Sequence, residues 1–370
     1  MTTRVVVISG SVGAGHDGVA AELARRMRSR GWEVTRYDFV ELLGRRAGRI
    51  ARRLYAAELT LAPATWGWLM PLLGRRRVAA TLDAVLYRLG IARTRAAVRP
   101  APDLVVSVYP AASQLLGRMR RDGELAAPVV TFLTDMSVHP LWVADGVDLH
   151  LALHDEAAAR ARAAGAARVR VAGAAVPPRF TPDGEPGERA YVRTRHGIPA
   201  DRPAVLIAAG SWGVGDVLAS AADVAASGLA VPVVLCGTNA RLRDALRDRR
   251  LGVALGWVDD LAPLIRSCDA VLQNAGGLTS LEALACGVPL LSYRCLPGHG
   301  STNAAALRDA GLAPWPQDAA ELATELGAAL RAGREPVPPL VRADPTEVFA
   351  ELVGPVPVVP RLAETAGVPA

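Results

Sequence analysis

The chain has 370 residues, of which 51% are apolar, 21% are charged and only 5% are aromatic. The apolar share excludes a disordered chain, and the length suits two domains of ordinary size. The 42 basic residues are all arginine, which excludes chemistry that needs a lysine, such as a Schiff base or a P-loop phosphate site.

The net charge of +6 is spread unevenly. Residues 1–100 contain 18 arginines and 7 acidic residues, whereas the remainder contains 24 arginines and 29 acidic residues. A basic first part predicts an anionic partner there, and an excess confined to one part argues against nucleic acid as that partner. The four cysteines form no CxxC pair and no histidines have zinc-ligand spacing. We therefore expect no metal site, and free thiols in a reducing cytoplasm.

Short apolar or β-branched runs alternate with helix-like segments along most of the chain. The first series lies at residues 4–9, 33–39, 103–109, 129–134, 149–154 and 168–176, and the second at 204–208, 232–235, 253–255, 270–272 and 290–293. Alternation of this kind predicts parallel sheets covered by helices on both faces. A Pro- and Gly-rich linker at 177–187 separates the series. We expect an α/β fold of two doubly wound, Rossmann-like domains, residues 1–180 and 181–335, facing each other across a cleft. A Pro-rich, poorly packed tail at 336–370 follows.

The first glycine-rich loop, GAGHDG at residues 13–18, follows the first predicted strand and contains Gly15 and His16. Its spacing is that of the dinucleotide fingerprint, and Asp38 lies at the end of the second predicted strand. A non-catalytic nucleotide- or NAD(P)-binding protein is therefore one alternative. The central histidine argues against it, because a dinucleotide loop needs only small residues there.

His16 is the candidate general base, because a histidine titrates near neutral pH. Asp135, at the end of another predicted strand, is the rival base. Asp17 either orients the His16 ring or caps the following helix, and we favour the cap. A turn histidine without catalytic work is the alternative for His16. We expect His139 and His154 to serve local structure.

Two more glycine-rich loops follow predicted strands in the second half. These are GSWGVG at residues 210–215, with Gly210 and Ser211, and NAGGLTS at 274–280. Glycines at a helix start let backbone N–H groups approach an anion, and the helix dipole favours its charge. Plain capping of the helix by Thr279 and Ser280 is the alternative. Ligands of open α/β sheets bind at such strand ends.

A helix rich in arginine is expected from about residue 43 to 54. Its arginines are Arg45, Arg46, Arg49, Arg52 and Arg53, and Leu43, Ala47, Ile50 and Leu54 lie on the other side. The stretch WGWLMPLL at 66–73 follows, then three arginines at 75–77. Tryptophans framed by arginines suit a lipid interface, so we expect contact with an anionic membrane at Arg49, Arg53, Trp66, Trp68 and Arg76. The alternative is an amphipathic helix packed on the sheet, with the tryptophans in the core.

Several segments together resemble the glycosyltransferase family 28, and within it the monogalactosyldiacylglycerol synthase and diacylglycerol glucosyltransferase group. In the first half these are GSVGAGH at 10–16, TDMSVHPLW at 134–142 and GAAVPPRF at 173–180. In the second half they are GWVDD at 256–260, NAGGLTSLEALACGVP at 274–289 and PGHGSTNA at 297–304.

This resemblance implies a GT-B fold and inverting, metal-independent transfer of a hexose from a UDP-sugar. The first domain would bind the acceptor and the second the donor, with His16 as the base and no cofactor. The donor site would comprise Gly276, Gly277, Thr279 and Ser280 at the diphosphate, Glu282 at the ribose, the backbone of Val258 at the uracil, and Gly298, His299 and Asn303 at the sugar. The family often has Gln-Glu where this chain has His299-Gly300, and Arg-Asn where it has Thr238-Asn239. The missing acid at position 300 leaves the donated sugar open.

We therefore expect a peripheral enzyme on the inner face of the plasma membrane that glycosylates a lipid such as diacylglycerol. A transferase acting on a secondary metabolite or a polyprenyl-linked acceptor is the alternative within the same class.

Overall fold

The computed structural model describes residues 2–11, 14–50, 53, 72 and 76–354. Within these residues the strands form two separate sheets, and all neighbouring strands are parallel. The predicted α/β class is confirmed.

The first sheet has six strands in the order β2-β1-β3-β4-β5-β6. They are β1 (Arg4–Ser9), β2 (Glu33–Asp38), β3 (Leu104–Ser107), β4 (Val129–Phe132), β5 (Leu149–Ala152) and β6 (Val169–Val171). The helices between them are α1 (Ala14–Ser29), α2 (Phe39–Leu42), α5 (Arg76–Ala97), α6 (Pro110–Arg121), the 3-10 helix η2 (Pro140–Trp142) and α7 (Asp155–Ala163). Every residue of β3, β4 and β5 is buried, which explains why each strand is apolar at all but one position.

The second sheet has five strands in the order β11-β10-β7-β8-β9. They are β7 (Ala204–Ala208), β8 (Val231–Leu235), β9 (Val253–Leu255), β10 (Ala270–Gln273) and β11 (Leu290–Ser292). Its helices are α8 (Glu188–His196), α9 (Val217–Ala226), α10 (Ala240–Asp248), α11 (Leu261–Ser267), α12 (Leu278–Ala285), α13 (His299–Asp309) and α14 (Ala319–Ala332).

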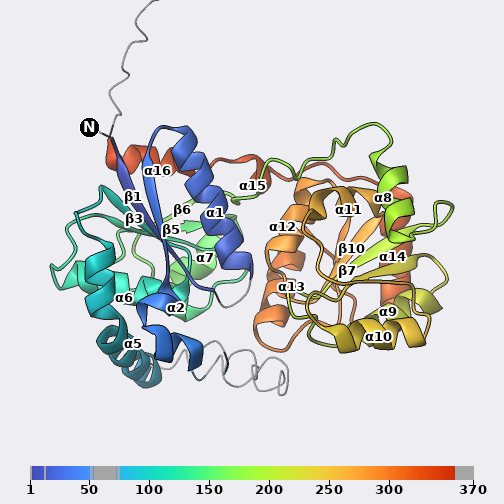
Figure 1. Cartoon of the computed structure of the whole chain (residues 1–370), viewed down its shortest axis with the longest axis horizontal. Helices are drawn as coiled ribbons and strands as arrows, with labels where there is room; N and C mark the ends of the chain where they lie inside the picture. The colour runs from blue at the N-terminus through green and yellow to red at the C-terminus, as the bar shows by residue number, and fades with distance from the viewer. Residues whose placement is uncertain (1, 12–13, 51–52, 54–71, 73–75, 355–370) are drawn as a thin grey trace, which may run out of the picture.

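The two domains lie side by side, with α1 of the first facing α12 and α13 of the second (Figure 1). They touch where α1 and α12 begin. A Cβ atom added to Gly18 would lie 2.7 Å from Cδ2 of Leu278. Because Gly18 has no side chain, the start of α1 can approach Leu278 of the second domain this closely.

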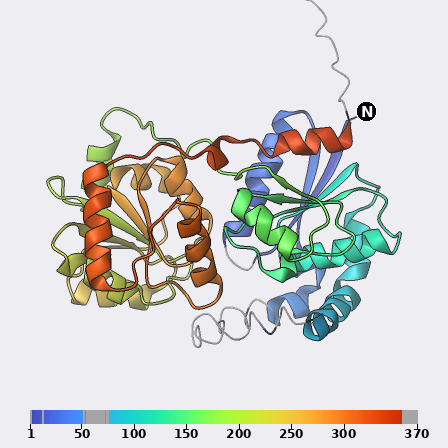
Figure 2. The same cartoon turned by 180° about the vertical axis from the view of Figure 1, so that it is seen from behind.

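The C-terminal segment differs from the poorly packed tail that the sequence predicts. After α14 the chain crosses back to the first domain (Figure 2). On the way, α15 (Pro339–Arg342) lies between the domains and contacts α12, and α16 (Thr346–Val353) then packs on α1 and β3 of the first domain. Phe349 is fully buried and Val348 is 6% exposed. The apolar residues Val348, Phe349, Leu352 and Val353 recur at helical spacing, and this pattern outweighs the many prolines before it. Residues 355–370 lie outside the described residues.

Truncation of Phe349 tests whether α16 stabilises the first domain. Phe349→Ala should lower the free energy of unfolding by about 3–5 kcal/mol, the usual cost of removing a buried aromatic ring. Urea unfolding measures it, with the exposed Glu347→Ala as the control on the same helix. A variant as stable as the parent would show that α16 is dispensable for the fold.

Candidate active site

The first half of the site forms at the C-terminal ends of β1, β3 and β4, which are neighbours in the sheet. His16 lies in the first turn of α1, and its Nδ1 is 3.1 Å from Oγ1 of Thr134. The ring centroid of His16 is 5.4 Å from that of Tyr109 and 5.9 Å from that of Trp142. The loop after β1 therefore holds an imidazole among groups from two other strand ends.

Burial lowers the pKa of His16 below the ordinary 6.5, and electrostatic interaction with the nearby His299 lowers this pKa further. The nearby carboxylate of Asp135 raises the pKa, but by less than burial lowers it. The ring is therefore neutral at pH 7, which is the form that can accept a proton.

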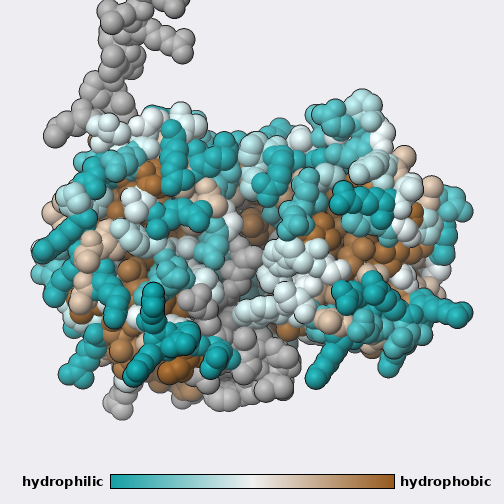
Figure 3. All heavy atoms as spheres, viewed as in Figure 1, coloured by the Kyte–Doolittle hydropathy of each residue, from teal (hydrophilic) through white to brown (hydrophobic). Residues whose placement is uncertain are grey.

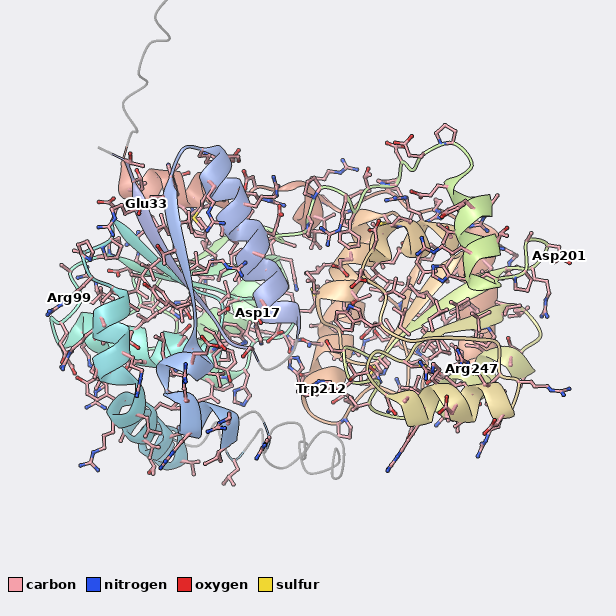
Figure 4. The ribbon with its side chains drawn as sticks, viewed as in Figure 1. Asp17, Glu33, Arg99, Asp201, Trp212 and Arg247 are labelled. Carbon is pink, nitrogen blue, oxygen red and sulfur yellow. The ribbon has the colours of Figure 1, made fainter. Side chains whose placement is uncertain are left out.

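Asp135 follows β4 and is tied to its surroundings on both oxygens. Its Oδ2 accepts a hydrogen bond of 2.9 Å from Nε1 of Trp142, and its Oδ1 lies 3.7 Å from Nε2 of His299 in the second domain. Trp142, which is almost fully buried, thus touches both candidate bases. Asp17 accepts a hydrogen bond of 2.6 Å from Oγ of Ser9, and Figure 4 places it at the end of α1 that faces the second domain.

Two further histidines, His139 and His154, precede the first residues of helices. His139 accepts a hydrogen bond from the backbone N–H of Leu141 at the start of η2, and His154 accepts one from Ala157 at the start of α7. The expected local role of both is confirmed.

The second half of the site forms at the ends of β7 and β10, which are paired in the sheet. The loop with Gly210 and Ser211 is bridged to the next loop, because the Thr238 N–H donates to the Ser211 carbonyl at 2.9 Å. Nδ2 of Asn274 donates to the Val214 carbonyl at 2.8 Å, which joins this loop to the one at residues 274–280. Trp212 lies on the side of the second domain nearest to the first (Figure 4).

The loop before α12 has the form of an anion site. Gly276 has a positive φ of 70°, and Gly277 precedes the first turn of the helix with open space where a Cβ would lie. Two buried polar atoms flank the loop, Oδ1 of Asn274 and Oγ of Ser280, and neither has a hydrogen-bond partner among the described residues. Buried atoms of this kind are rare and call for an explanation.

Glu282 lies on α12 with only 7% of its surface exposed. Burial raises the pKa of its carboxyl to about 7, and Arg179 and a hydrogen bond with Thr279 oppose this only in part. A buried carboxyl with so few compensating partners is costly to the fold when ionised, which is typical of a functional residue.

The other expected donor residues lie at the same edge of the second domain. Gly298 begins α13 with a φ of 76°, and the His299 side chain is 47% exposed. Asn303 is fully buried, and its amide contacts both domains. Val258 is half-buried after β9. Gly15 has no atom within 4 Å of where a Cβ would lie.

The membrane residues are only partly described. Arg49 and Arg53 are exposed, whereas Trp66, Trp68 and the side chain of Arg76 lie outside the described residues. Within the described part of the chain, no helix is long and apolar enough to cross a membrane, and no group of three or more His, Cys, Asp or Glu side chains is placed to hold a metal ion.

Two parallel α/β domains that face each other, with glycine-rich loops at the strand ends of both, form the GT-B fold. The family model that matches residues 16–176 is described as monogalactosyldiacylglycerol (MGDG) synthase. The predicted resemblance is thereby confirmed.

Two curated relatives are similar to the chain in sequence, and one solved structure is similar to it in fold. The chain is 28% identical to the processive diacylglycerol beta-glucosyltransferase of Bacillus pumilus (strain SAFR-032) over 220 residues, which cover 57% of this chain and 56% of that protein. The alignment thus spans little more than half of that relative. The chain is 24% identical to the enzyme of the same name from Bacillus mycoides (strain KBAB4) over 357 residues, or 89% of this chain and 86% of that protein. The glycosyltransferase SnogD from Streptomyces nogalater superposes with a TM-score of 0.54 and 20% identity, covering 95% of this chain and 99% of that chain. The predicted GT-B fold is confirmed.

Sequence reasoning missed several residues that the structure brings to the site. Tyr109 follows β3 and packs on His16, and Gln273 at the end of β10 accepts a hydrogen bond from the Gly276 N–H. Their position directly at a strand end was the available signal. Ser137 lies inside the TDMSVHPLW segment, but its contact with Asn303 spans 166 residues of sequence and has no local signal.

The raised pKa of Glu282 predicts how stability depends on pH. Because the folded-state pKa of about 7 exceeds the ordinary 4.5, the stability that the protonated form contributes is complete below pH 4.5 and is lost as the pH rises through 7. At pH 8 the free energy of unfolding of Glu282→Gln should therefore exceed that of the parent by up to ~3 kcal/mol, and its melting temperature should be higher. At pH 4.5 the two proteins should be similarly stable. The exposed Glu185→Gln is the control. Equal melting of Glu282→Gln and the parent at pH 8 would contradict the burial of a costly charge.

Proposed function

We propose that this protein transfers a hexose from a UDP-sugar to a hydroxyl group of a diacylglycerol-type lipid, with inversion at the anomeric carbon and without a metal ion. The observation that carries the proposal is the approach of two unlike clusters across the domain boundary. One is the proton-accepting cluster of His16, Thr134 and Asp135, and the other is the glycine-rich start of α12. His299 on the second domain lies 3.7 Å from Asp135 on the first.

The first cluster suits activation of an acceptor hydroxyl. In this proposal the acceptor oxygen forms a bond to the anomeric carbon while the bond from that carbon to the UDP oxygen breaks. The neutral imidazole of His16 takes the hydroxyl proton, and the charge of Asp135 stabilises the imidazolium that results. Asp135 is the weaker candidate for the base, because its Oδ2 already accepts from Trp142.

The second cluster suits the departing diphosphate. The backbone N–H groups at the start of α12 and the helix dipole favour an anion, and such preorganised dipoles stabilise developing charge without a metal. The unpartnered Oγ of Ser280 is in the first turn of this helix. Glu282, two residues further on, is the proposed acceptor for the ribose hydroxyls. The Val258 backbone is proposed to lie at the uracil, and the loop with Gly210 and Ser211 beside the phosphates.

A lipid acceptor is supported by the names of the relatives and by one surface of the first domain. Arg46, Arg49 and Arg53 are exposed next to Ile50, which is 59% exposed. Leu43 is buried and Ala47 packs against the core, so only part of the predicted apolar side faces inward. On the adjacent helix α5, Val85 and Leu89 are 47% and 42% exposed around Arg88. Figure 3 shows hydrophobic and hydrophilic side chains side by side on this lower part of the first domain.

We propose that this mixed surface, Arg46, Arg49, Ile50, Arg53, Val85, Arg88 and Leu89, rests on the anionic inner face of the plasma membrane. Arginines supply attraction to acidic lipids, and the apolar side chains insert between them.

Replacement of the base tests the reaction. His16→Ala should lower kcat by roughly 10²–10⁴-fold, the usual share of general-base catalysis, while UDP affinity stays near that of the parent. Because burial lowers the pKa of His16, the parent's kcat/KM should fall only as the pH drops below 6.5, and the variant should lose this decline. The rate of UDP release with diacylglycerol vesicles measures kcat and its pH dependence. The control variant is His196→Ala, which replaces a histidine on the second domain. Near-parent turnover of His16→Ala would move the role to Asp135. In isothermal titration calorimetry, Glu282→Gln should bind UDP more weakly than the parent by roughly 1–3 kcal/mol.

Charge removal tests the membrane surface. Arg49→Ala/Arg53→Ala should weaken binding to phosphatidylglycerol vesicles at low salt by about 2 kcal/mol, at about 1 kcal/mol for each arginine. Added salt should weaken the parent more than the variant. The control is Arg247→Ala/Arg249→Ala, two exposed arginines on the second domain. A parent protein that ignores such vesicles would favour a soluble acceptor, such as a secondary metabolite.

A further inference from the structure

The amide of Asn303 joins three segments that are far apart in the sequence. Its Oδ1 accepts hydrogen bonds from the Ser137 backbone N–H at 2.8 Å and from the Ser137 hydroxyl at 2.7 Å. Its Nδ2 donates to the Ala275 carbonyl at 2.9 Å. Asn303 is fully buried and Ser137 is 7% exposed, so these bonds form away from water, where an unpaired partner is costly.

The three segments belong to different working parts. Ser137 lies in the first domain, two residues after Asp135. Ala275 lies in the second domain, in the loop that precedes α12. Asn303 lies on α13, and its neighbour Thr302 places Oγ1 3.2 Å from Oγ of Ser137.

The loop cannot move independently of Asn303. A Cβ atom added to Gly276 would lie 2.4 Å from Cβ of Asn303, so the backbone of Gly276 rests directly on that side chain. Hence a displacement of Asn303 moves both the carbonyl to which it donates and the glycine against which it packs.

Another polar contact between the domains involves neither Asn303 nor the loop before α12. Nη2 of Arg160 on α7 donates to Oδ2 of Asp309 on α13 at 3.2 Å. Both side chains are about a third exposed, at 32% and 38%, and ion pairs of this kind contribute little. It therefore serves as the control for the buried contact.

We propose that Ser137, Thr302 and Asn303 form a latch that couples closure of the two domains to the geometry of the loop before α12. With the domains closed, Ser137 fixes Oδ1 of Asn303, and the opposite end of the same amide fixes Ala275. With the domains apart, Oδ1 exchanges both donors for water, and the side chain that supports the loop is released. Ser137 is thus a positioning residue for a ligand that it does not touch, and Asn303, which the sequence assigns to the donor sugar, acts between the domains. The proposal rests on the proposed function only in taking this loop as the diphosphate site.

The first test removes the hydroxyl of Ser137. Ser137→Ala should weaken UDP binding about 5-fold, the equivalent of one neutral hydrogen bond of about 1 kcal/mol. It should raise the donor KM by a similar factor, and the radius of gyration of the free protein in small-angle scattering should increase. Ser137→Thr, which keeps the hydroxyl, should bind UDP within twofold of the parent. The control Asp309→Asn should change neither UDP affinity nor the radius of gyration. A Ser137→Ala variant that binds UDP like the parent would overturn the proposal.

The second test locks the latch. Ser137→Cys/Thr302→Cys places two thiols where the hydroxyl oxygens are 3.2 Å apart, close enough for a disulfide after small adjustments. Diamide takes up the two thiol hydrogens as the S–S bond forms. The oxidised form should bind UDP at least as tightly as the reduced form, while turnover falls more than 10-fold and returns when dithiothreitol reduces the bond. The parent treated with diamide controls for its own four cysteines. An oxidised form that binds UDP more than 10-fold weaker than the reduced form would show that the latched state excludes the donor.

The two proposals fail differently. If the parent binds no UDP, the proposed donor is wrong, and the scattering comparison alone decides whether the latch holds the domains together. If the parent binds UDP but Ser137→Ala matches it, the donor stands and the latch is wrong.

Discussion

Parallel strands end together, and this constraint shapes the whole molecule. In each sheet every strand delivers its C-terminal residue to the same edge, so loops that are distant in sequence become neighbours there. In the first domain this brings His16, Tyr109 and Thr134 within contact. In the second it links the loop after β7 to the loop after β10 through Asn274. Under the proposed function each domain by itself offers only half of a transfer site, because the proposed proton acceptor lies on one sheet and the proposed anion-binding loop on the other. Their relative position is therefore as important as the residues themselves.

Burial performs opposite tasks in the two halves. At His16 it lowers the pKa and so keeps the imidazole neutral and ready to accept a proton. At Glu282 it raises the pKa to about 7 and so makes the ionised carboxylate costly. A ligand that donates hydrogen bonds to that carboxylate recovers the cost on binding, so part of the affinity for such a ligand is present in the free protein as instability. The unpartnered Oγ of Ser280 nearby has the same character.

The parts of the fold that depend on local pattern could be predicted from the sequence. All eleven strands of the described residues fall within or beside the expected runs, because a buried parallel strand needs a short apolar run wherever it lies. The glycine-rich loops were also visible, since a close approach of backbone to a ligand or a helix requires glycine. His16 was visible because a dinucleotide loop needs only small residues at its position and because a histidine titrates near neutral pH.

What the sequence could not show depends on contacts between distant segments. Asn303 has the same local pattern whether it faces a sugar or Ser137, and only the position of the other domain decides between them. The return of α16 to the first domain depends on a surface that α1 and β3 provide. The many prolines of this segment instead suggested a poorly packed tail. Gly18 reads as the last glycine of a ligand loop, yet its missing side chain also admits Leu278 of the facing domain.

The boundary between the domains therefore carries two kinds of contact with different consequences. The apolar contact of Gly18 with Leu278 has no directional requirement, and it tolerates small rotations of one domain against the other. The hydrogen bonds at Asn303 are directional and buried, so a small rotation breaks them outright and leaves their groups unpaired. With both kinds of contact, the two domains can rotate against each other, yet the hydrogen bonds at Asn303 form in only one closed arrangement. Because the recognising amide also holds Ala275, that position is the one in which the start of α12 is held in the form seen here.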